Sequence, residues 1–128
     1  MRKLLLTLAA IYLGVIGLSL MLVPQQFGVG AVPPDASPQL LALLRLLGGP
    51  MLGIAVLNWL VRGDASPAVI PVLAGNLVGF GLVAANDVWG VASGEARDVA
   101  RYFLIVHLGF AAAFLLALQA ARREGRSG

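Results

Sequence analysis

Cysteine is absent from the 128 residues, and charged residues are scarce. Without cysteine the chain has no disulfide, no thiolate metal ligand and no thiol nucleophile. Only 12% of the residues are charged, against about 25% in an ordinary soluble domain. Because 59% of the residues are hydrophobic, little polar sequence is left to coat a soluble globule. These shortages favour a membrane protein.

Motifs for catalysis and for nucleic-acid binding are also lacking. The chain has no nucleophile elbow, no phosphate-binding glycine loop, no H-E-x-x-H and no acid pair at glycosidase-like spacing. A single histidine makes a metal site unexpected, and we expect no cofactor. The isoelectric point is near 10.2, but no basic stripe is interleaved with aromatic residues, so we expect no nucleic-acid partner.

Four apolar runs are each long enough to cross a bilayer as a helix, which takes about 20 residues. The sequence therefore predicts an all-α fold: a polytopic membrane four-helix up-down bundle, with residues 1–128 as one domain. The first run is longer than the apolar region of a signal peptide and has no convincing cleavage site, so we expect it to be retained. The predicted helices are 4–23, 39–61, 67–89 and 98–121.

Proline, glycine and serine mark the connections. A loop is predicted over residues 24–38, ending with Ser37 as the N-cap and Pro38 at the first helical position of the second span. A polar loop is predicted over residues 90–97. Asp98 then suits the N-terminus of the fourth span, because the helix dipole favours an anion there.

Small residues predict where helices approach closely. Gly14 and Gly17 give the first span a narrow side. Gly75 and Gly79 form a small-xxx-small pair in the third span, which indicates either self-association or packing inside the bundle. In the second span, Pro50 removes a backbone hydrogen bond and predicts a kink.

Basic residues near the ends of the spans predict the orientation. The N-terminus, the second loop and the C-terminus contain six of them, whereas the first and third loops contain Arg97, or two if Arg101 at the edge is counted. Lysine and arginine concentrate on the cytoplasmic side, so both termini are predicted to be cytoplasmic. The six are Arg2, Lys3, Arg62, Arg122, Arg123 and Arg126.

Polar residues in the third span share one helical face. Asp87 is the only acid inside any hydrophobic run, and a carboxylate facing lipid is costly, so this face is predicted to point at other helices. Advancing 100° per residue places six residues within about one third of the circumference. They are Asn76, Gly79, Phe80, Val83, Asn86 and Asp87.

The up-down topology predicts a polar cluster near the outer face, made of Arg45, Asn86, Asp87, Arg101 and, deeper, His107. In one interpretation, Asp87 pairs with Arg45 or Arg101 and clips the helices together. In the other, the same residues form a pocket for an anionic or carbonyl-bearing amphiphile. The sequence leaves both open.

Asn58, Asn76 and also His107 of the cluster are predicted to hydrogen-bond between helices. Asn58 and Asn76 would each contribute roughly 1 kcal/mol. His107 has phenylalanines at neighbouring helical positions, and such a histidine serves more often as a hydrogen-bond partner than as a general base or metal ligand.

The segment Arg45–Gly63, RLLGGPMLGIAVLNWLVRG, resembles a group of small bacterial four-helix membrane proteins. These are mostly domains of unknown function, with a distant likeness to DoxX-like proteins. The shared features are P-x-x-F at Pro24–Phe27, then R-x-x-G-G at Arg45–Gly49 and Trp59 near the end of the second span. The resemblance implies a four-helix bundle in a bacterial inner membrane, and it implies no particular activity.

The function predicted from these features is non-catalytic. We expect an accessory subunit, or a component that binds lipid or a small amphiphile through the polar cluster. One alternative is a membrane-embedded, isomerase-like enzyme in which Asp87 and His107 move a proton on a lipophilic substrate. Another is a small proton-coupled transporter. The expected partners are the lipid bilayer and either a lipophilic small molecule or a larger membrane complex. The sequence leaves open whether the protein forms a homo-oligomer.

Overall fold

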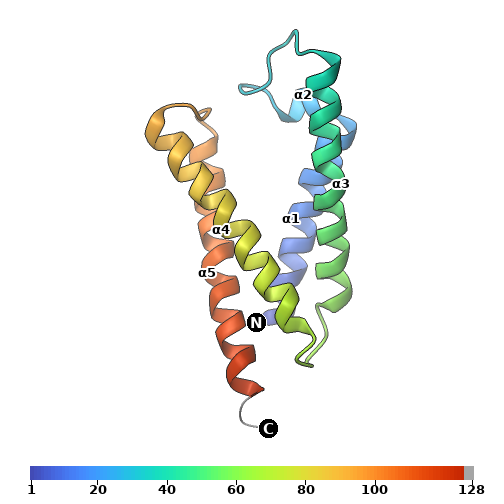
Figure 1. Cartoon of the computed structure of the whole chain (residues 1–128), viewed down its shortest axis with the longest axis vertical. Helices are drawn as coiled ribbons and strands as arrows, with labels where there is room; N and C mark the ends of the chain where they lie inside the picture. Colours follow the sequence, from blue (N-terminus) through green and yellow to red (C-terminus); the bar gives the residue numbers. More distant parts are fainter. Residues whose placement is uncertain (126–128) are drawn as a thin grey trace. The chain divides into compact units, whose positions relative to one another are not determined.

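Four long helices account for most of the chain, and a fifth helix is a single turn. The computed structural model describes residues 1–125. Its helices are α1 (Arg2–Leu22), α2 (Pro24–Phe27), α3 (Pro38–Val61), α4 (Val69–Ser93) and α5 (Ala100–Glu124), shown in Figure 1. Over these residues there is no strand. The predicted all-α class is confirmed.

Each long helix is long and apolar enough to cross a membrane, so residues 1–125 contain four candidate spans. Many of their large apolar side chains are exposed, among them Leu46, Leu82 and Ile105, which are 71%, 67% and 69% exposed. An ordinary soluble surface does not carry such continuous apolar helices. The protein is a multi-pass membrane protein, and its spanning helices contact the lipid bilayer.

The chain divides into two compact units. One consists of residues 6–62 and contains most of α1 together with α2 and α3. The other begins at Gly63, contains α4 and α5, and includes residues 1–5. Within the second unit, Arg2 at the chain start lies 3.7 Å from the carboxylate of Glu124. The long helices pack as pairs, and each pair is described below by itself.

In the first unit, α1 and α3 approach each other at two glycines. A Cβ atom placed on Gly48 would lie 2.6 Å from the carbonyl oxygen of Gly17 and 2.6 Å from Cγ of Met21. A Cβ atom on Gly17 would lie 2.9 Å from the carbonyl oxygen of Gly48. Small residues let membrane helices pack backbone against backbone. The narrow side predicted for the first span at Gly17 is therefore the contact surface for α3.

The connection between α1 and α3 is more ordered than the predicted loop. Pro24 opens the four-residue helix α2, in line with the preference of proline for a first helical position. Ser37 then caps α3 as predicted, since its Oγ accepts a hydrogen bond of 3.2 Å from the backbone N–H of Leu40. The helix α3 continues through Pro50 to Val61.

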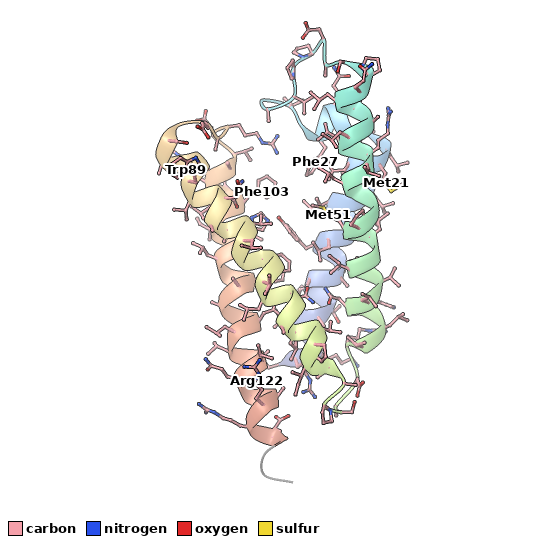
Figure 2. The ribbon with its side chains drawn as sticks, viewed as in Figure 1. Met21, Phe27, Met51, Trp89, Phe103 and Arg122 are labelled. Atoms are coloured by element: carbon pink, nitrogen blue, oxygen red, sulfur yellow. The ribbon has the colours of Figure 1, made fainter. Side chains whose placement is uncertain are left out.

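In the second unit, α4 and α5 form an antiparallel hairpin (Figure 1). Its core consists of apolar side chains from both helices, including Leu73, Phe80 and Ala84 from α4 and Phe114 and Ala117 from α5. Figure 2 shows Trp89 and Phe103 at the loop end of this hairpin and Arg122 at the opposite end.

The predicted loop over residues 90–97 is shorter in the structure, because α4 continues to Ser93. Gly94 follows with φ of 77°, in the left-handed region. Glycine adopts this conformation without steric penalty and commonly ends a helix. Helix α4 therefore stops at Gly94, and Asp87 lies roughly two turns inside it instead of close to its end.

Candidate functional site

Asp87 and His107 form a direct pair across the α4–α5 hairpin. Nδ1 of His107 lies 2.5 Å from Oδ2 of Asp87. The carboxylate accepts the hydrogen bond from Nδ1–H, and this contact fixes the orientation of the imidazole ring. The side chains are 11% and 15% exposed, respectively, so the pair is largely but not completely covered.

The register of the hairpin brings the two residues together. Asp87 lies roughly two turns before the end of α4 at Ser93, and His107 lies roughly two turns after the start of α5 at Ala100. Antiparallel helices joined by a short loop place such positions at the same level. The hairpin geometry thus explains a pair of residues that are 20 positions apart.

Aromatic rings surround the imidazole. Phe80 of α4 lies with its centroid 6.1 Å from that of His107, and Phe103 lies one helical turn away on α5 at 6.2 Å. The stack continues from Phe80 to Phe110 at 4.5 Å and to Phe114 at 5.7 Å. Ring pairs at these distances attract each other. The polar pair is therefore held against an apolar aromatic wall.

Within the α4–α5 hairpin, two members of the predicted polar cluster are in contact. Asp87 engages His107, whereas Arg101 is exposed on α5 and Asn86 is exposed on α4. Arg45 is exposed on α3, in the other unit. In the hairpin, the hydrogen-bond partner of Asp87 is thus the histidine, whereas the arginine predicted as its partner on α5 is exposed.

The two predicted interhelical asparagines are buried, each in a different unit. Asn58 of α3 is 0% exposed and Asn76 of α4 is 5% exposed. Nδ2 of Asn76 donates a hydrogen bond of 2.8 Å to the carbonyl oxygen of Val72, one turn earlier in the same helix. This bond satisfies a buried amide within its own helix.

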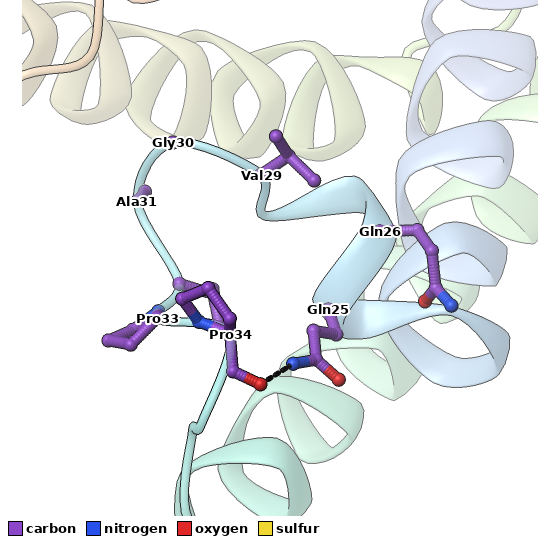
Figure 3. A pocket seen from close by; sticks show the side chains of 8 residues that line it. Gln25, Gln26, Val29, Gly30, Ala31, Pro33 and Pro34 are labelled. Atoms are coloured by element: carbon purple, nitrogen blue, oxygen red, sulfur yellow. Dashed lines mark hydrogen bonds between the residues drawn. The ribbon is translucent and has the colours of Figure 1, made fainter.

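A cavity of about 700 Å³ lies in the connection between α1 and α3. Gln25, Gln26 and the segment 29–34 line it (Figure 3). Nε2 of Gln25 donates a hydrogen bond of 2.5 Å to the carbonyl oxygen of Pro34, which ties the single turn of α2 to the proline-rich segment. None of the lining residues is acidic, basic or nucleophilic, so the cavity offers shape and amide groups but no acid–base chemistry.

A metal site is not supported by the described part of the chain. Over residues 1–125, no three histidine, cysteine, aspartate or glutamate side chains are close enough to hold an ion. Asp87 and His107 by themselves supply two ligands, fewer than the three protein ligands of catalytic zinc sites.

Comparisons with protein-family models, with curated proteins and with solved structures found no match for this chain. The site must therefore be interpreted from its own chemistry.

From the sequence, His107 was predicted to hydrogen-bond between helices, and it does so with Asp87. The sequence analysis joined these two residues only in the enzyme alternative and otherwise paired Asp87 with an arginine, because a third span ending at residue 89 put Asp87 nearer the surface than His107. Gly94 was the available signal, because a glycine after an apolar run is typical of a helix end. If the third span is taken to end just before Gly94, Asp87 and His107 are predicted at about equal distances from the loop.

Proposed function

We propose that the protein is a non-catalytic component of a bacterial inner membrane that binds a lipid or small amphiphile at the outer end of the α4–α5 hairpin. The observation that carries this proposal is the Asp87–His107 pair, a partly accessible polar site inside an apolar hairpin. Polar groups at such depth are expensive, and they commonly mark binding sites.

The exposed arginine on α5 supports an amphiphile with an anionic or carbonyl-bearing headgroup. Because Asp87 engages His107, the carboxylate that was predicted to neutralise Arg101 is used elsewhere. An exposed guanidinium beside apolar helix surface can bind a carboxylate or phosphate while the acyl chain lies along the helix. Asn86 of the same hairpin is exposed as well and belongs to the proposed cluster.

The binding test uses the purified protein in lipid nanodiscs with oleate as the probe. We expect Arg101→Gln to weaken oleate binding about tenfold, because one charge-assisted hydrogen bond contributes about 1.5–3 kcal/mol. Arg122→Gln, at the opposite end of α5, is the matched control and should bind as the unmodified protein does. Equal oleate affinity in all three proteins would contradict the proposal.

A second substitution separates a binding site from a structural clip. If the cluster is a pocket, Asp87→Asn abolishes oleate binding and leaves the melting temperature unchanged. If the pair only holds α4 to α5, the same variant melts at a lower temperature whether or not oleate is present. Native mass spectrometry from membranes, which retains bound lipids and subunits, would identify the natural ligand and the oligomeric state.

One observation favours a second candidate function, an isomerase-like membrane enzyme. A carboxylate bonded to Nδ1 orients a histidine for use as a general base. This candidate requires turnover of an added lipophilic substrate that disappears in His107→Ala. Turnover that persists in this variant would rule out His107 as the base.

A further inference from the structure

Charged residues are absent from a long part of the chain that extends beyond the first span. No aspartate, glutamate, lysine, arginine or histidine occurs between Lys3 and Asp35. The helix α1 takes up the first part of this stretch and ends at Leu22, which already gives the length of about 20 residues that a span needs. The uncharged sequence therefore continues through most of residues 23–37, the connection between α1 and α3, which we call the first connection.

The other two connections between long helices are charged. The turn between α3 and α4 contains Arg62 and Asp64, and the loop between α4 and α5 contains Glu95 and Arg97. Charged side chains keep a loop in water, because their removal from water is costly. Residues 23–34 carry no such charge. The first connection thus differs from the others in the property that decides whether a loop can enter a bilayer.

Exposed apolar side chains extend from the end of α1 into the first connection. Leu22 at the end of α1 is 73% exposed, and Val23 and Val29 in the connection are 44% and 68% exposed. The spanning helices contact the lipid bilayer, so this apolar surface is continuous with one that lipid covers. Side chains in such a position gain free energy when they move from water into the edge of the bilayer.

The backbone of the first connection makes hydrogen bonds of its own. Four of its N–H groups donate to carbonyl oxygens of residues 23–28, at distances of 2.7 to 2.9 Å. Three prolines have no N–H that needs a partner. Because an unpaired backbone group is costly away from water, this pairing lowers the cost of placing the connection in the membrane surface. The donors are Phe27, Gly28, Ala31 and Val32, and the prolines are Pro24, Pro33 and Pro34.

A side-chain hydrogen bond closes the first connection into a compact loop. Gln25 donates this bond to the carbonyl oxygen of Pro34, and Figure 3 shows Val29 and Gly30 on the far side of the loop from it. The loop contains the cavity described above, whose lining is uncharged. Gln26, another lining residue, is exposed, and its amide N–H can donate to an ester carbonyl. Apolar and amide groups together suit the layer in which lipid ester groups meet acyl chains.

We propose that the first connection lies in the interfacial layer of the bilayer, with Val29 among the upper acyl chains and the glutamine amides at the level of the ester groups. Its partner is phospholipid, recognised by the uncharged glycerol-ester region and not by the charge of a headgroup. The chain returns to water at Asp35, just before Ser37 caps α3. This inference goes beyond the proposed amphiphile site, which belongs to the other unit.

The test uses the absence of cysteine from the chain. A nitroxide spin label is attached to Val29→Cys in the full-length protein in phosphatidylcholine nanodiscs, and EPR measures its collisions with oxygen, which concentrates in lipid, and with a water-soluble nickel complex. We expect high oxygen and low nickel accessibility. Asp35→Cys is the matched control and should show the reverse. Both side chains are exposed in the structure, so a difference between them reports the bilayer.

The same measurement distinguishes the other possible surroundings of the loop. High nickel accessibility at both positions places the first connection in water. Low accessibility to both reagents at Val29→Cys indicates a protein contact, such as a second copy of the chain. Either result overturns the proposal. Ala31→Cys, at another exposed position of the same loop, should behave as Val29→Cys does, and it decides the matter if Val29→Cys does not fold.

A second measurement removes any influence of the spin label. In the same nanodiscs, a charged maleimide should react with Val29→Cys roughly tenfold more slowly than with Asp35→Cys, because entry of a charged reagent into the interfacial layer is costly. Equal reaction rates would overturn the proposal. Oleate binding is a separate measurement, so the failure of either proposal leaves the other in place.

Discussion

Asp64, a carboxylate outside the membrane spans, organises the turn between α3 and α4. Its Oδ1 accepts a hydrogen bond of 2.7 Å from the backbone N–H of Ser66. This bond, assisted by the Ser66 hydroxyl, holds the pKa of Asp64 below the ordinary value of 3.8. The hydroxyl oxygen of Ser66 in turn accepts a hydrogen bond of 3.3 Å from the N–H of Ala68, just before α4.

The lowered pKa gives a prediction with a definite sign. A depressed folded-state pKa means that the ionised carboxylate contributes stability above the unfolded-state pKa, near 3.9. This contribution is lost as the pH falls through the folded-state pKa. Asp64→Asn keeps an oxygen acceptor but cannot ionise, so its melting temperature should fall less than that of the unmodified protein between pH 6 and pH 3.

The measurement is thermal unfolding in detergent across this pH range. Asp35→Asn, which removes another exposed loop aspartate, is the matched control. The same pH dependence in Asp64→Asn and in the unmodified protein would show that the Ser66 contact has no effect on stability.

The pairing of Asp87 with His107 marks how far single residues could be predicted. The free-energy cost of a carboxylate facing lipid indicated that Asp87 needs a polar partner, and in the structure His107 is this partner. The identity of this partner depends on the register between two helices. Helical periodicity describes the faces of each helix alone and does not give the register between two helices. Arginine was preferred as the partner because it is charged, and the contact with histidine could not be predicted in this way.

At the scale of helices, the sequence was most informative at helix starts. Ser37-Pro38 predicted the beginning of α3, and the structure has the cap at Ser37. The short helix α2 was missed because four residues are too few to show a helical period. Of the predicted glycine contacts, Gly17 packs closely, whereas a Cβ atom placed on Gly75 or Gly79 would meet no atom of residues 1–125 within 4 Å. Sequence showed which glycines are candidates but not which face a neighbour.

The close contact of α1 with α3 predicts a sensitivity at Gly48. We expect Gly48→Ala to lower stability by about 1–3 kcal/mol, because the added methyl group overlaps the carbonyl oxygen of Gly17 and forces the helices apart. Gly53→Ala in the same helix is the control, since its Cβ would meet nothing within 4 Å. Its higher helix propensity should leave stability equal or slightly increased.

Thermal or denaturant unfolding in detergent micelles measures both variants. Equal destabilisation by the two alanines would mean that the glycine contact contributes nothing particular to the packing of α1 and α3.

For the whole molecule, the four candidate spans confirm a multi-pass membrane protein, and the orientation stays a proposal. The basic residues at the chain start, in the second loop and at the end of α5 support cytoplasmic termini. Arg126, which was counted for this orientation, lies outside the described residues.

Absence of cysteine makes the orientation directly measurable. Single substitutions Asp35→Cys, Ser66→Cys and Glu95→Cys introduce one thiol into each successive loop. In intact cells, we expect an impermeant thiol reagent to label the first and third variants but not the second. Labelling of the second variant alone would reverse the proposed orientation.

The hairpin of α4 and α5 has a consequence for how the protein is made. Its two helices are consecutive in the chain and separated by a short loop, so their contacts are local and can form quickly. As the nascent chain leaves the ribosome, Asp87 therefore gains its hydrogen-bond partner as soon as the next helix follows. Insertion of these two helices as one unit would spare the bilayer a lone acid during biogenesis.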